Sequence, residues 1–210
     1  MKHMKIIIQS LILFLIVSSC CREDSIETAR YELTTDELAL LPYTNGERIN
    51  FIHSNGYSFD FNVIEDKVEW QEHHDFCEWN CCGNEYFSYQ VKTTILESTY
   101  PKFRIEFSQG GTRFSDYDPQ VLNMEINYRH FIQLPYDTLT NFICDSVTNT
   151  IYYDSISLNN QTFYEVVMKN FDSHRFISDS SALVPMSFYF NNLGLIQIEM
   201  SNYETYTINN

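Results

Sequence analysis

The sequence predicts an all-β, strand-dominated domain: an antiparallel sheet, arranged as a sandwich or as a curved, half-open barrel, with one short helix at its N-terminal end. Two observations lead to this fold class. Aromatic residues are abundant, with 15 Tyr and 16 Phe, whereas Gly (6) and Pro (5) are scarce, and aromatic side chains favour pleated, half-buried surfaces. In addition, apolar and polar residues alternate along many short segments, which is the period of a strand with one face in water.

The one helix expected in this domain begins near residue 34. Thr34 and Glu37 have the spacing of a capping box, in which each side chain bonds the backbone of the other residue. Leu33 and Leu38 stand where a hydrophobic staple would place them, one on either side of the cap. We therefore expect a helix of about two turns, with Leu38 and Leu41 packed on the sheet.

The expected strands follow as hairpins. Residues 48–53 and 57–63 are joined by Asn55-Gly56, a dipeptide that accepts the positive φ angles of a tight turn. Residues 87–95 and 103–107 form a second pair around Pro101. Further strands are expected over residues 125–134, 150–156, 162–169, 185–190, 195–200 and 204–208.

The first 19 residues have the layout of an export signal. Lys2 and Lys5 precede an apolar run over residues 6–17. Twelve helical residues span about 18 Å, well short of a hydrocarbon core of ~30 Å, so the run is typical of a cleaved signal peptide. Ser18 and Ser19 then precede Cys20, in a pattern that resembles the bacterial lipobox.

Cys20 is thus the predicted lipidation site, and acyl chains such as palmitate would hold the protein in a membrane. Residues 20–32 would form the lipid anchor and a polar tether, and residues 33–210 a single β-rich domain. Arg22, Glu23 and Asp24 resemble the surface-export signal of Bacteroidota lipoproteins, although any polar tether would also stay solvated. We expect the cell outer membrane as the location, and leave open whether the protein faces the periplasm or the cell surface.

Charge excludes one class of partner. The chain has a formal net charge of −15, and it becomes −17 once Lys2 and Lys5 leave with the signal, since 11 basic and 28 acidic residues remain. Such a field repels phosphate backbones, so nucleic acid is not an expected partner.

Residues 73–83 are the most chemically dense segment. They include His73, His74, Cys77, Cys81 and Cys82, and imidazole with thiolate is a set that suits zinc or copper. Because an exported protein meets an oxidising compartment, disulfides are favoured instead, among the four candidates Cys77, Cys81, Cys82 and Cys144. A bridge between the neighbouring Cys81 and Cys82 would strain their peptide unit. We therefore expect one of these two to pair with Cys77 and the other with Cys144, with a metal site on His73, His74, Cys77 and Cys81 as the alternative.

Two stretches carry a family resemblance. One runs from Leu33-Thr34-Thr35-Asp36-Glu37 to Leu41-Pro42-Tyr43, Gly46 and the strand at 49–51, and the other is Phe188-Tyr189-Phe190-Asn191-Asn192-Leu193-Gly194-Leu195-Ile196. Together they resemble the opening and closing segments of small, flavobacterial-type outer-membrane lipoproteins of Bacteroidota. The resemblance implies a location and an architecture, and no active-site residues.

No sequence motif for nucleophilic, metal or nucleotide chemistry occurs, so we expect a binding or interaction module rather than an enzyme, without a cofactor. A protein or a glycan is the expected ligand, with Trp70 and Trp79 as the contact surface. The alternatives are a structural or accessory subunit of an envelope complex, a curved sheet that shields a lipid, and a metal-dependent enzyme built on residues 73–82.

Overall fold

The predicted fold class is confirmed. The computed structural model describes residues 25–74, 85–110, 120–127, 130–136, 150–170 and 184–209, with the side chains of residues 120, 121 and 130–136 left undescribed. These residues are mostly strands of one sheet, in which all pairings but one are antiparallel, and they include a single short helix. The described residues divide into two compact units, one of residues 25–31, 71–74 and 85–89, the other of residues 32–70 and the described residues from 90 to 209.

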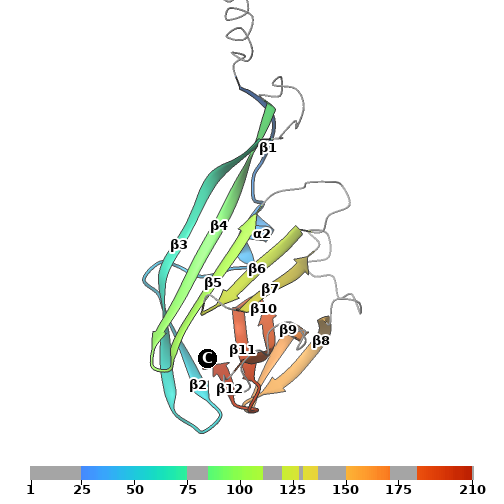
Figure 1. The fold of residues 1–210 in the computed structure, drawn as a ribbon. Helices are drawn as coiled ribbons and strands as arrows, with labels where there is room; N and C mark the ends of the chain where they lie inside the picture. Colours follow the sequence, from blue (N-terminus) through green and yellow to red (C-terminus); the bar gives the residue numbers. More distant parts are fainter. Residues whose placement is uncertain are drawn as a thin grey trace, which may run out of the picture. The chain divides into compact units, whose positions relative to one another are not determined.

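The larger unit contains most of the sheet (Figure 1). Its strand order is β7-β6-β5-β4-β3-β2-β12-β11-β10-β9-β8. The last strand therefore lies in the middle, between β2 and β11, and joins strands from the two halves of the sequence. The strands are β2 (Arg48–His53), β3 (Ser58–His74), β4 (Glu85–Thr99), β5 (Lys102–Gly110), β6 (Gln120–Ile126), β7 (His130–Tyr136), β8 (Thr150–Leu158), β9 (Gln161–Asn170), β10 (Pro185–Asn191), β11 (Gly194–Met200) and β12 (Thr205–Ile208).

One predicted strand was wrong. Residues 125–134 were expected to run as a single strand, but β6 ends at Ile126 and β7 begins at His130. Asn127 has a φ of 50°, a left-handed conformation that Asn tolerates better than most residues. Its side-chain oxygen accepts a hydrogen bond from the Arg104 backbone N–H at 2.8 Å, and this bond fixes the reversal against β5.

The predicted helix cap is confirmed, although the helix is shorter than expected. Helix α2 spans Thr35–Ala39, and the reciprocal capping box between Thr34 and Glu37 is formed. Leu41 is fully buried in the core as predicted, whereas Leu38 is only half-buried and the neighbouring Leu40 packs against the core instead.

Two polar side chains of the sheet hold the end of this helical segment. The Lys92 amine donates a hydrogen bond of 2.7 Å to the Leu41 carbonyl. The Gln109 amide donates one of 2.8 Å to the Glu37 carbonyl. The Gln109 amide is a second donor to the Glu37 carbonyl, which also accepts the Leu40 backbone N–H, and Lys92 gives the Leu41 carbonyl a donor just beyond the helix. These contacts fix the segment on β4 and β5.

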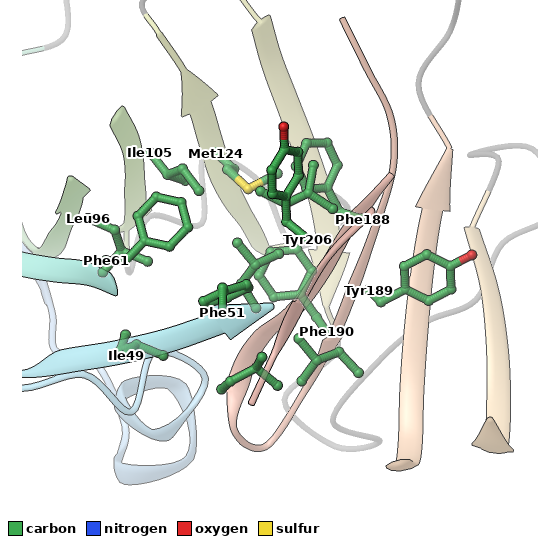
Figure 2. Close-up of a cluster of buried hydrophobic side chains, with 14 of the residues drawn as sticks. Ile49, Phe51, Phe61, Leu96, Ile105, Met124, Phe188, Tyr189, Phe190 and Tyr206 are labelled. Atoms are coloured by element: carbon green, nitrogen blue, oxygen red, sulfur yellow. The ribbon is translucent and has the colours of Figure 1, made fainter. Parts of the chain in front are cut away.

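Aromatic rings dominate the core of the larger unit. The alternation predicted for β3 is confirmed, because Phe59, Phe61 and Val63 are all buried. The Phe51 and Phe61 rings meet edge to face, with their centroids 5.1 Å apart. Figure 2 shows side chains from β2 to β6 gathered with others from β10 to β12. The two halves of the sheet therefore share one core. Burying each such ring contributes about 1.5–3 kcal/mol to the stability of the fold.

The smaller unit contains a strand that was not among the expected ones. Within the segment predicted as a polar tether, residues 26–31 form strand β1 (Ile26–Tyr31), which pairs in parallel with β4 over Glu85–Tyr89. The Tyr31 and Phe87 rings meet edge to face at 6.0 Å. Most side chains of β1 are exposed, so the strand lacks the apolar alternation by which strands are usually recognised.

Candidate binding site

Two turns of the larger unit lie side by side at one end of the sheet. The first joins β2 to β3: the His53 N–H donates to the Tyr57 carbonyl at 2.9 Å, and Gly56 takes a φ of 95°. This confirms the turn predicted at Asn55-Gly56. The second joins β11 to β12, and the Ser54 N–H donates to the Thr205 carbonyl at 2.8 Å. Segments that lie far apart in the sequence are therefore held together by backbone hydrogen bonds.

A histidine lies between these turns. His53 is 4% exposed; its ring stacks on Tyr57 at 4.6 Å with an interplanar angle of 12°, and meets the Tyr206 ring edge-on at 4.8 Å. Tyr57 also contacts Tyr100, from the turn between β4 and β5, with ring centroids 6.2 Å apart. With Glu204, described next, these four residues are called the histidine–tyrosine cluster.

Both nitrogens of His53 have partners. Nδ1 accepts a hydrogen bond from the Asn55 backbone N–H at 3.0 Å, so in this arrangement the ring proton is assigned to Nε2. Nε2 lies 3.5 Å from the Glu204 Oε2. Because neither nitrogen is left to accept a proton from a substrate, the geometry suits a structural or binding role for His53 better than general base catalysis.

The cluster carries one negative charge. A hydrogen bond from the Asn202 side chain, followed by interaction with His53, lowers the pKa of Glu204, so this carboxylate is ionised at neutral pH. Burial, then the neighbouring Tyr100 and Glu204, raises the pKa of Tyr57. Burial is also the main cause that raises the pKa of Tyr206 to about 12. The cluster thus combines a carboxylate with neutral phenol groups.

Two tyrosines at this end are open to solvent. Tyr100 is 77% exposed and Tyr203 is 84% exposed. Tyr203 directly precedes Glu204 in the turn between β11 and β12, and takes a φ of 67°, which is uncommon for a residue with a side chain. Tyrosine is enriched at binding interfaces, because its ring is apolar and its hydroxyl can form hydrogen bonds.

Only some of the site residues predicted from the sequence lie among the described residues. Trp70 lies in β3 and is 39% exposed, while Trp79 lies outside the described residues. Cys20, Cys77, Cys81, Cys82 and Cys144 also lie outside them, so the lipidation and disulfide predictions stay predictions.

The two histidines of the alternative metal site are described. The His73 ring packs on Phe87 at 4.9 Å, and the His74 ring packs on Tyr86 at 5.4 Å. Adjacent residues of a strand point to opposite faces, so in this conformation the two imidazoles do not converge on one ion. The described residues contain no cluster of three or more metal-ligating side chains.

The histidine–tyrosine cluster was missed from the sequence. His53 was included only as the end of a predicted strand, and Tyr100 was not singled out. The only signal was the Tyr-rich composition, which does not say which rings meet. Their proximity depends on the pairing of β12 with β2, in which Tyr206 lies opposite His53.

Comparison with known proteins identifies no relative of this chain, so its function has to be inferred from the geometry of the site. No family model, curated protein or solved structure matches the chain. In the described part of the chain, no helix combines the length and hydrophobicity of a membrane span.

Proposed function

We propose that this protein is a lipid-anchored binding protein of the bacterial outer membrane, which contacts its ligand through the histidine–tyrosine cluster and Tyr203. The anchor is Cys20, as the lipobox pattern indicates. The observation that carries the binding role is the exposure of two tyrosines at this end of the sheet: Tyr203, which precedes the ionised Glu204, and Tyr100, whose ring contacts Tyr57.

The architecture beneath these residues supports binding rather than catalysis. His53 and Tyr206 are buried and form a rigid base, while the exposed rings are carried by tight turns. Sites whose side chains are fixed by packing lose little conformational entropy when a ligand binds. Both ring nitrogens of His53 are engaged, so this imidazole is not free to act as a base.

Site-specific photo-cross-linking in cells tests the binding surface and captures the ligand whatever its class. A benzophenone amino acid replaces Tyr100 in one strain, and Tyr164, which is 67% exposed on β9, in a control strain. We expect an adduct with an envelope glycan or protein at position 100 and a weaker one, or none, at position 164. Equal labelling at both positions, or none at 100, would contradict the proposal.

Membrane fractionation tests the anchor separately. A Cys20→Ala variant has no thiol to take a lipid, so we expect it to leave the outer-membrane fraction, whereas Cys21→Ala keeps the wild-type distribution. Retention of the Cys20→Ala variant in the membrane would contradict the proposed lipid anchor. It would not affect the test of the binding surface by cross-linking.

A further inference from the structure

We infer that the ligand of the histidine–tyrosine cluster is an uncharged saccharide, whose sugar rings stack on Tyr100 and Tyr203 while a sugar hydroxyl donates to Glu204. This inference rests on the proposed binding function and narrows it to one ligand class. Three observations carry it: the exposure of the Tyr100 and Tyr203 rings, the polar groups of the cluster near them, and the negative charge of the cluster.

Openness distinguishes a sugar from an organic cation. A cation gains substantially from aromatic rings only when they enclose and desolvate it; at exposed sites the gain is about 0.5–1 kcal/mol. Tyr100 and Tyr203 are 77% and 84% exposed, and one face of Tyr57 is covered by His53. The exposed rings are thus platforms rather than a cage, and the flat apolar face of a pyranose can cover such a ring.

The polar groups match the edge of a sugar ring. Glu204 Oε2 faces His53 at 3.5 Å, and an ionised carboxylate has further lone pairs that accept hydrogen bonds from hydroxyls. Tyr100 and Glu204 both lie close enough to the Tyr57 phenol to raise its pKa. A carboxylate that accepts hydrogen bonds and a phenol that can donate one therefore lie near the exposed aromatic rings, and a polyol needs both kinds of group.

Charge selects against acidic sugars. The cluster contains an ionised carboxylate and no lysine or arginine, in a chain whose net charge is −15. A uronic acid or a sulfated sugar placed against Glu204 would meet repulsion of like charges, strengthened wherever water is excluded. A neutral oligosaccharide meets no such barrier.

The test uses the full-length protein in detergent micelles and isothermal titration calorimetry. The neutral probes are hexasaccharides of β-1,4-glucose, α-1,4-glucose, β-1,4-xylose and β-1,4-mannose. The charged probes are hexagalacturonate, a heparin hexasaccharide and tetramethylammonium. We expect at least one neutral probe to bind, and each charged probe to bind at least about tenfold more weakly.

Variants place that binding at the cluster. Tyr203→Asn removes the ring but keeps a residue that tolerates the left-handed backbone, and Glu204→Gln removes the charge while keeping the shape. Each is expected to weaken binding of the neutral probe at least about tenfold. Tyr164→Ser, which removes an exposed ring elsewhere, is expected to leave it unchanged. Far-UV circular dichroism and melting temperatures check that all variants are folded.

The outcomes separate this inference from the proposed function. Stronger binding of a charged probe, or binding that survives both Tyr203→Asn and Glu204→Gln, overturns the inference. If no saccharide binds while cross-linking at position 100 captures a protein, the saccharide is wrong and the binding surface stands. If position 100 captures nothing and no probe binds, both fail.

Discussion

The backbone N–H of Leu195 donates a hydrogen bond of 2.7 Å to the hydroxyl of Tyr43, a residue 152 positions earlier in the sequence. Tyr43 lies just after the helix, and Leu195 lies at the start of β11. Both residues are buried, and burial raises the pKa of the Tyr43 hydroxyl. The contact therefore ties the N-terminal segment of the larger unit to one of its last strands.

Removing this hydroxyl is expected to destabilise the protein. Tyr43→Phe leaves the Leu195 N–H buried without its partner, and an unsatisfied buried donor costs about 1–3 kcal/mol. Urea denaturation followed by tyrosine fluorescence or circular dichroism measures the change in the free energy of unfolding. Tyr164→Phe, which alters an exposed ring, serves as the control. A Tyr43→Phe variant as stable as this control would show that the hydrogen bond contributes nothing.

Gly194 is expected to tolerate no side chain, for two separable reasons. Its φ is 85°, and a Cβ there would lie 2.3 Å from the Tyr43 hydroxyl oxygen. Gly56 has a similar φ of 95° but nothing within 4 Å of a Cβ. Gly56→Ala therefore measures the backbone strain alone, roughly 1–2 kcal/mol, and Gly194→Ala should lose about 1–3 kcal/mol more through overpacking. Equal losses in urea denaturation would rule out the steric conflict with Tyr43.

Lys92 is expected to matter far more than Lys67, although both lie close to carboxylates. The Lys92 amine is buried, donates to the Leu41 carbonyl, and lies 3.4 Å from Asp66 Oδ1. Lys92→Met leaves both acceptors without this donor and should lose about 3 kcal/mol of stability. The Lys67 amine lies 2.8 Å from Glu65 at the surface, where ion pairs contribute little, so Lys67→Met should cause no measurable change. Similar losses in the two variants would contradict the burial argument.

Two hydroxyls on β4 provide a matched comparison. Thr94 Oγ1 donates to Asp66 Oδ1 at 2.7 Å, whereas the buried Ser98 Oγ has no hydrogen-bond partner among the described residues. Thr94→Val removes one partner of a hydrogen bond and should lose about 1–2 kcal/mol. Ser98→Ala removes an unsatisfied polar group and should be neutral or slightly stabilising. Chemical denaturation of both variants decides the matter, and a larger loss for Ser98→Ala would reveal a partner for that hydroxyl.

Alkaline pH is expected to weaken the fold through Tyr206. Its pKa is raised to about 12, whereas a tyrosine in an unfolded chain titrates near 10. The folded state therefore holds this proton more tightly, so the stability it contributes is complete below a pH of about 10 and is lost as the pH rises from about 10 to about 12. Tyr206→Phe keeps the ring and removes the titration, so its free energy of unfolding should fall less steeply over that range. Parallel curves for the two proteins would refute this assignment.

The features that could be predicted from the sequence are those fixed by residues close together in the chain. The capping box at Thr34 and the turn at Gly56 are each fixed by residues close to one another in the chain, so the sequence alone contains the signals for them. Alternation along β3 likewise predicts which side chains are buried, because a strand with one wet face must alternate. β1 was not predicted because most of its side chains are exposed, so its sequence shows no alternation of apolar and polar residues.

The candidate site could not be predicted in the same way. His53 and Glu204 meet because β12 pairs with β2, and apolar alternation does not specify which strands become neighbours. Trp70 and Trp79 were chosen from composition and chain proximity, whereas the cluster draws its rings from segments that are distant in the sequence. Prediction of the site therefore needed the topology of the sheet.

The central position of β12 has a consequence for biosynthesis. Nascent strands β2 to β7 and β8 to β11 can form hairpins with neighbours that are already translated, but these two groups remain unjoined until residues 205–208 have left the ribosome. Such long-range pairing is slow, and it leaves strand edges exposed in the meantime. The larger unit thus stays incompletely assembled until β12 has been synthesised, a condition under which chaperones bind and transport machineries can still thread the chain.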